Sequence, residues 1–203
     1  MSKQRLESLS DAVFAIAITL LVIDLKLPDN DHQQLLRQLI QHIPNMAAYV
    51  LSFIIIGLYW VAHHTMFQFI MHVNRTVIWL NLLVLMAVSF IPFPASVLGA
   101  HVADPTAIIF YAGSLAMVNI MSTCLWIGST RTASIEPSFR RFVVITHGSP
   151  VIVYGIAAAV ANLYLWLAWA LIAAVPLFFI LPNSLINRRL QNAKDHHDQT
   201  SSG

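Results

Sequence analysis

Long apolar stretches recur along almost the whole chain, and they constrain its fold more than any other feature. A helix needs about 20 apolar residues to cross the hydrocarbon core of a bilayer. Only 10% of the residues are charged, whereas a soluble domain carries about 25%. We therefore expect an all-α integral membrane protein, one domain over 1–186 with six transmembrane helices at about 8–27, 46–67, 76–98, 106–128, 142–161 and 163–186.

The segments between these stretches carry the expected helix breakers. Pro92 and Pro94 are predicted to end the third helix, and Gly148 and Pro150 are predicted to kink the fifth. Residues 31–42 place four apolar side chains on one helical face, which predicts a short amphipathic helix at the membrane surface: Leu35, Leu36, Leu39 and Ile40. The polar residues 187–203 are expected to form a cytoplasmic tail.

Lysine and arginine are distributed unevenly between the two sides of such a bundle. With the N-terminus inside the cell, only Lys26 and Arg37 lie outside. The nine other cations lie inside: Lys3, Arg5, Arg75, Arg131, Arg140, Arg141, Arg188, Arg189 and Lys194. Because cytoplasmic segments carry the excess of positive residues, we predict a multi-pass protein of the cell membrane (plasma or inner membrane) with both termini in the cytoplasm.

Several functional classes lack their usual signals. The net charge of +2 gives no basic surface of the kind that binds nucleic acid. The single cysteine, Cys124, permits no intrachain disulfide. Walker A, HExxH and GxSxG motifs are missing, as is a TVGYG carbonyl filter. We therefore expect neither an enzyme nor a protein with a bound cofactor.

Charged residues near the start of the first helix need an explanation, because charge inside a membrane is unfavourable. Arg5 and Asp11 are six residues apart, with Ser8 and Ser10 close by. One interpretation is a buried polar cluster that ties this helix to its neighbours. The spacing alone favours the other, an interfacial helix start in which Asp11 lies near the positive end of the helix dipole and Arg5 reaches the headgroups.

The first helix also carries a seven-residue repeat of apolar side chains. Its members recur at alternating steps of four and three residues, with Thr19 beside them: Leu9, Val13, Ile16, Leu20, Ile23 and Leu27. Such a face is typical of packing between helices, and the pattern alone favours that interpretation. The alternative is a pore wall, which would need symmetry-related copies of the chain around one axis.

Three histidines lie in or near the apolar stretches: His63, His64 and His147. Adjacent helical residues point about 100° apart, and neither a carboxylate nor a thiolate lies at ligand spacing beside His63 and His64. A hydrogen-bonded structural histidine is favoured over a metal ligand.

Three ordered motifs resemble the TMEM175 family of potassium-permeable channels. Residues 5–11 (RLESLSD) resemble its R-x-x-x-F-S-D signature, with Leu9 in the place of phenylalanine. Residues 60–64 (WVAHH) resemble its W-x-x-H stretch, and residues 80–83 (LNLL) with 89–93 (SFIPF) resemble a segment of its third helix.

This resemblance implies a symmetric homotetramer of six-helix subunits, in which the first helix lines a central pore. It places a constriction at four residues: Ile16, Thr19, Leu20 and Ile23. It also implies a signature polar cluster formed by Arg5, Ser10, Asp11, His63 and Asn81. With the resemblance, the pore wall and the polar cluster become the favoured interpretations of the first helix.

The leading hypothesis is passive conduction of potassium ions through a hydrophobic constriction in the lipid bilayer. A secondary transporter is the alternative, because the break at 148–150 could form a site in the middle of the membrane. A metal- or haem-binding protein that uses His63, His64 and His147 is a weaker hypothesis.

Overall fold

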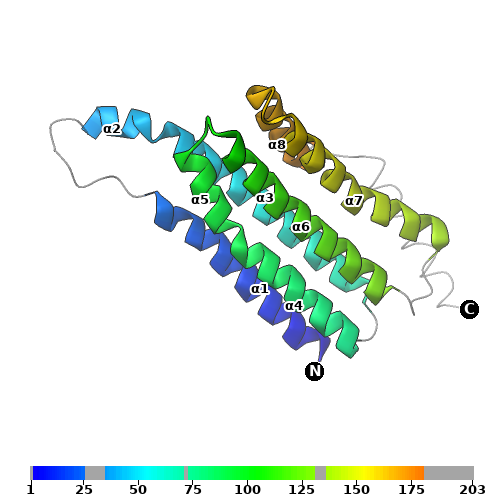
Figure 1. The fold of residues 1–203 in the computed structure, drawn as a ribbon. Coiled ribbons are helices and arrows are strands. Elements are labelled where there is room, and N and C mark those ends of the chain that lie inside the picture. Colours follow the sequence, from blue (N-terminus) through cyan, green and yellow to red (C-terminus); the bar gives the residue numbers. More distant parts are fainter. Residues whose placement is uncertain (1, 26–34, 71–72, 131–135, 181–203) are drawn as a thin grey trace, which may run out of the picture.

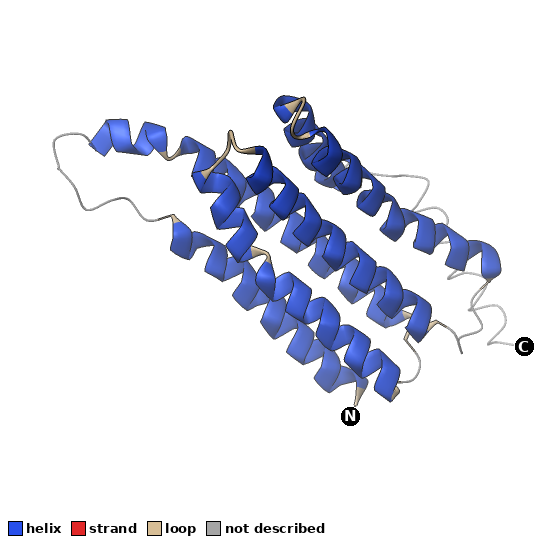
Figure 2. Cartoon of the chain, in the orientation of Figure 1, coloured by secondary structure: helices blue, strands red, loops and turns tan. Residues whose placement is uncertain are grey.

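The computed structural model describes residues 2–25, 35–70, 73–130 and 136–180, and these residues form helices and short connections only (Figure 2). The predicted all-α fold is confirmed. In chain order the helices are α1 (Lys3–Leu20), the 3-10 turn η1 (Leu21–Asp24), α2 (Leu35–Gln41), α3 (Ile43–Gln68), α4 (Arg75–Phe90), α5 (Pro92–Ala100), α6 (Pro105–Ser129), α7 (Pro137–Val160) and α8 (Leu165–Ile180).

Five helical segments among the described residues are long and apolar enough to cross a membrane: Lys3–Ile23, Ile43–Gln68, Arg75–Ala100, Pro105–Ser129 and Arg140–Val160. The chain is therefore a multi-pass membrane protein. The sixth expected helix corresponds to α8, an apolar helix of 16 described residues. Residues 181–186 of that expected helix, and the expected tail at 187–203, lie outside the described residues. The count of six crossings stays a prediction.

Two expected helix boundaries differ from the structure for local reasons. The first helix begins at Lys3, not at residue 8, because Ser2 caps it by accepting a hydrogen bond from the Arg5 backbone N–H at 3.4 Å. Pro92 and Pro94 do not end the third helix; the chain breaks only at Ile91, and Pro92 begins α5. Proline is tolerated in the first turn of a helix, where its missing N–H has no partner within the helix.

The helices form two layers (Figure 1). In the first layer α1 packs on α4, α4 on α6 and α6 on α7, and α5 extends α4 beside α6. The second layer contains α3, which packs on α1 and α5, and α8, which packs on α7 and α3. Consecutive long helices run in opposite directions, so the start of α1 lies at the same end of the bundle as the start of α4.

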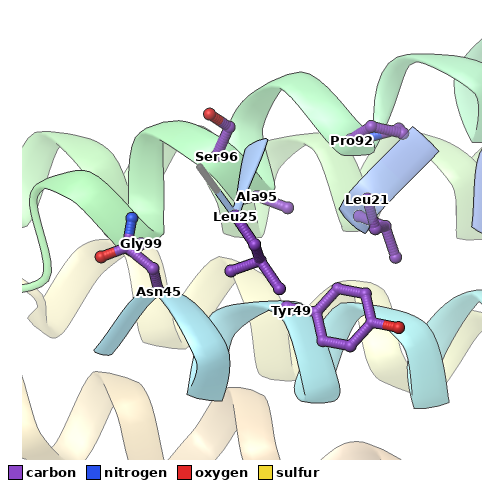
Figure 3. A pocket seen from close by; sticks show the side chains of 8 residues that line it. All are labelled: Leu21, Leu25, Asn45, Tyr49, Pro92, Ala95, Ser96 and Gly99. Atoms are coloured by element: carbon purple, nitrogen blue, oxygen red, sulfur yellow. The ribbon is translucent and has the colours of Figure 1, made fainter. Parts of the chain in front are cut away.

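One close approach fixes how α3 and α5 cross. The Cα of Gly99 leaves so little room that a Cβ there would lie 3.0 Å from the Cα of Asn45. Both residues line a small pocket of about 10 Å³ that also receives Leu21 and Leu25 from the end of the first span (Figure 3). Glycine at this position therefore permits backbone-to-backbone contact between two elements that are distant in sequence.

The start of α6 is capped by an acidic side chain. Asp104 accepts a hydrogen bond from the Thr106 backbone N–H at 2.8 Å. This bond stabilises the charged carboxylate, so the pKa of Asp104 is lowered from its ordinary value.

Candidate functional site

The first helix presents two distinct faces. One face is buried against α3 and α4, and its members recur at steps of three or four residues: Leu6, Ser10, Phe14, Ala17 and Leu21. The other face carries the seven-residue repeat, and Ile16 and Ile23 on it are 57% and 50% exposed. Apart from the partly buried Val13, the described members of the repeat are exposed. Leu27 lies outside the described residues.

The four expected constriction residues all lie on the exposed side of this span. Leu20 joins Ile16 and Ile23 among the exposed apolar side chains. The exposed Thr19 hydroxyl donates to the Ile16 carbonyl at 2.9 Å. The hydroxyl hydrogen is thus used within the helix, and the hydroxyl oxygen can still accept a hydrogen bond on the exposed side.

A buried polar cluster holds the opposite face of the same helix. The Asn81 side-chain amide donates to the Ser10 hydroxyl oxygen at 3.0 Å, and the Ser10 hydroxyl donates to the Leu6 carbonyl at 2.9 Å. Asn81 Oδ1 accepts a hydrogen bond from His63 Nε2–H at 2.7 Å. We call Ser10, His63 and Asn81 the buried triad; it connects α1, α3 and α4.

Aromatic rings fix the orientation of the histidine in this triad. The His63 ring lies between Phe14 of α1 and Phe67 of α3, with centroid separations of 5.4 and 4.7 Å. Because the hydrogen bond and both ring contacts constrain it, His63 can present its Nε2–H to Asn81 in only a narrow range of orientations.

Two expected members of the polar cluster lie outside the buried triad. Asp11 is exposed and accepts a hydrogen bond from the Trp60 indole N–H at 2.9 Å. Arg5 is exposed, and its guanidinium makes no hydrogen bond or ion pair with any residue that the structure describes. Asp11 is therefore joined to α3 through Trp60. This partner was not predicted, although Trp60 begins the W-x-x-H stretch.

A second polar network was missed from the sequence. Asn119 on α6 donates to the Tyr59 hydroxyl oxygen at 2.6 Å and to the Leu115 carbonyl at 2.9 Å. Ser52 and Tyr111 lie 2.8 Å apart, oxygen to oxygen, one helical turn or more further along the same pair of helices. A lone asparagine in an apolar stretch was the available signal, since such residues in membrane helices usually bond across helices.

The other two histidines contribute to no metal cluster in the described part of the chain. No group of three His, Cys, Asp or Glu side chains comes together within residues 2–25, 35–70, 73–130 and 136–180. His64 is exposed and stacks on Trp60, with ring centroids 6.1 Å apart. His147 Nδ1 donates to the Val143 carbonyl at 3.1 Å on its own helix.

Comparison with known proteins gives concordant results. A family model described as "Endosomal/lysosomal potassium channel TMEM175" matches residues 5–92. A protein of Streptomyces collinus named as a potassium channel is 41% identical over 133 residues, which cover 63% of this chain and 65% of that protein. Another from a Chryseobacterium strain, also named as a potassium channel, is 29% identical over 199 residues, covering 94% of this chain and 99% of the relative.

A solved structure agrees over nearly the whole length. The crystal structure of a "lysosomal potassium-selective channel TMEM175 homolog" from Chamaesiphon minutus superposes with a TM-score of 0.80. The two sequences are 28% identical, and the superposition covers 90% of this chain and 98% of the other. The two chains therefore share one fold over most of their length.

Proposed function

Because the chain belongs to the TMEM175 family, we propose that it is a channel subunit through which potassium ions pass passively, and that four copies surround one pore. The observation that carries this proposal is the division of α1 into two faces. One face is held by the buried triad, while Ile16 and Ile23 of the apolar repeat stay exposed in the described part of the chain. A second copy of the chain supplies a packing partner for this face.

In the proposed assembly the α1 helices of all copies meet around the symmetry axis. One helix cannot enclose a pore, so closed symmetry is required. Ile16, Leu20 and Ile23 then form stacked apolar rings, with Thr19 as a hydroxyl layer. Apolar rings can close a pore by excluding water. Selectivity would depend on pore width and on how readily an ion sheds its water, and we expect it to be modest.

We propose that the buried triad positions α1 against this axis. Asn81 holds α1 through Ser10 and holds α3 through His63, so the pore-lining helix is tied to two others at the same level. Asp11 adds a tie to α3 through Trp60. The exposed guanidinium of Arg5 lies one turn or more before these ties, near the end of the pore that we assign to the cytoplasm.

The proposed orientation places both termini in the cytoplasm of a cell bounded by this membrane. This orientation puts nine of the lysine and arginine residues on the cytoplasmic side and two on the other side, as expected because positive residues concentrate in cytoplasmic segments. α2 is expected to lie at the opposite surface, where all four apolar members of its face are exposed: Leu35, Leu36, Leu39 and Ile40.

Ion flux into liposomes tests the function directly. Purified protein, shown to be tetrameric by mass measurement, is reconstituted, and fluxes of K⁺, Na⁺ and H⁺ are measured separately. We expect K⁺ flux that exceeds Na⁺ flux and does not saturate as a carrier would. A tetrameric preparation that passes no potassium would contradict the proposal.

A polar substitution in the proposed constriction tests the pore position. We expect Ile16→Asn to increase conductance or to weaken discrimination against Na⁺, because the amide keeps the narrowest level hydrated. The matched control is Ile152→Asn, since Ile152 is 66% exposed on α7 and lies outside the proposed pore. If both variants conduct as the unmodified protein does, Ile16 is not in the constriction.

A further inference from the structure

A cavity of about 390 Å³ lies between α3, α6, α7 and α8, away from the exposed face of α1. Its volume falls within the range of roughly 300–1,000 Å³ that is typical of ligand sites in proteins. Its wall is formed mainly by aliphatic and aromatic side chains, and none of the described residues that line it is Asp, Glu, Lys or Arg. The cavity is thus suited to an apolar molecule with few polar groups.

Two prolines line this space inside the helical bundle. Pro150 of α7 and Pro176 of α8 are both buried and both line the cavity. Proline cannot donate a hydrogen bond to the carbonyl four residues earlier, which for Pro150 is that of Thr146. The Ser149 hydroxyl donates to this carbonyl at 3.2 Å instead. α7 therefore continues through Pro150, with a side-chain donor in place of the missing backbone donor.

One polar group on the wall belongs to α6. The Asn119 amide nitrogen donates to two acceptors, the Tyr59 hydroxyl and the Leu115 carbonyl. These two bonds identify that atom as nitrogen and leave Asn119 Oδ1 as an acceptor. No donor to Oδ1 is found among the residues that the structure describes.

A second polar side chain on the wall, His147, belongs to α7. His147 Nδ1 lies 3.1 Å from the Val143 carbonyl, so the proton of a neutral imidazole is on Nδ1. Nε2 is then an acceptor, and within the described ranges it has no donor. Asn119 and His147 both line the cavity, and each therefore offers a hydrogen-bond acceptor and no donor to its interior.

We propose that this cavity binds an uncharged, single-chain amphiphile from the bilayer, whose head group donates one hydrogen bond. The aliphatic chain contacts the apolar wall, and the donor, a hydroxyl for example, bonds to His147 Nε2 or Asn119 Oδ1. A charged head group is excluded, because no opposite charge lines the wall and an unpaired charge in the membrane is strongly unfavourable. The site stands whether or not the chain conducts ions.

Photolabelling identifies the occupant class. The full-length protein in nanodiscs of phosphatidylcholine and phosphatidylglycerol is irradiated with a long-chain primary alcohol that carries a diazirine in its tail. Labelled residues are located by mass spectrometry. We expect saturable labelling concentrated on cavity-lining residues of α6 and α7. The methyl ether of the same probe should label about three- to tenfold less, since it cannot donate a hydrogen bond.

Two variants separate the cavity from the lipid-facing surface. Ser122→Phe fills the cavity from α6 and should reduce labelling there by about tenfold, a change of roughly 1.4 kcal/mol. Ile120→Phe is the matched control, because Ile120 is exposed on the same helix and does not line the cavity. His147→Phe keeps the ring but removes one of the two acceptors, so it should reduce the preference for alcohol over ether. This readout does not depend on whether Ser122→Phe folds.

Three results of the labelling experiment would overturn the proposal. Labelling spread evenly over lipid-facing residues, or labelling that Ser122→Phe leaves unchanged in a folded protein, would show that the cavity is not a site. Equal labelling by alcohol and ether in the unmodified protein would show that it does not select a hydrogen-bond donor.

Discussion

Replacing Asn81 by leucine measures how much the buried triad stabilises the bundle. Asn81 is 0% exposed, accepts from His63 Nε2–H at 2.7 Å and donates to Ser10 at 3.0 Å. Leucine has a similar size and removes both bonds. Ser10 keeps its bond to the Leu6 carbonyl, but the His63 N–H is left buried without an acceptor. That group alone makes Asn81→Leu destabilising by about 1–3 kcal/mol.

Replacing His63 by phenylalanine removes the other partner of the same bond. The ring contacts with Phe14 and Phe67 can persist, while Asn81 Oδ1 loses its donor at 2.7 Å and keeps only the longer contact of 3.5 Å with the Ser10 hydroxyl. We expect a similar loss of about 1–3 kcal/mol. In the double variant both the His63 donor and the Asn81 acceptor are absent, so neither is left buried without a partner. The Ser10 hydroxyl still donates to the Leu6 carbonyl. The double variant should therefore be destabilised by about 1–2 kcal/mol less than the sum of the two single changes.

Reversible unfolding in mixed micelles, driven by a denaturing detergent, gives the four free energies that this cycle needs. The control pairs Asn81→Leu with Ser89→Ala, because the exposed Ser89 hydroxyl bonds only to the Met86 carbonyl of its own helix. That pair should be additive within about 0.5 kcal/mol. Strict additivity for His63→Phe and Asn81→Leu would refute the hydrogen bond as a source of stability.

Two further predictions concern the ends and crossings of helices. Gly99→Ala should lower the free energy of unfolding by about 1–3 kcal/mol, and with it the thermal midpoint, because the new Cβ would lie 3.0 Å from the Asn45 Cα. Gly155→Ala is the control and should not lower the midpoint, because no atom lies within 4 Å of its Cβ. Equal midpoints for the two variants would contradict the close contact at Gly99. Asp104 has a lowered pKa because the Thr106 N–H bonds to its carboxylate, so its contribution to stability is present above the unfolded-state pKa and is lost as the pH falls through the folded-state pKa. Unfolding measured from about pH 7 to pH 3 should show the difference between the unmodified protein and Asp104→Ala narrowing with acidity, and a difference independent of pH would rule out the charged cap.

Helix content was predictable because the length of an apolar stretch is set by the thickness of the bilayer. The ends were less predictable, because they depend on single capping residues. Ser2 extends the first helix to Lys3, and Pro92 starts a helix where it was expected to stop one. The hydropathy of the chain predicts neither helix end. Ser2 lies at the edge of the apolar stretch, and Pro92 is a residue type that usually ends a helix.

The candidate site was predictable only in part, for a related reason. Ser10 and Asn81 are separated by 71 positions in the chain, and no local sequence pattern predicts a contact between them. Their contact was predicted only from the resemblance of the three motifs to the family. Periodicity identified the apolar face of α1, but the pattern alone favoured packing between helices, and only the resemblance favoured a pore wall. The bond between Asn119 and Tyr59 had no comparable motif, and a single polar residue in an apolar helix does not identify its partner.

The position of His63 has a thermodynamic consequence. Its ring bonds to Asn81 in the buried triad and also forms part of the cavity wall, so one side chain is shared by the support of α1 and by a compartment on the other side of α3. A molecule in the cavity that binds one conformation of α1 more tightly than another, through its contact with His63, must shift the equilibrium of α1 by that difference in binding free energy. Linkage makes this effect reciprocal: the conformation of α1 must change the affinity of the cavity by an equal factor.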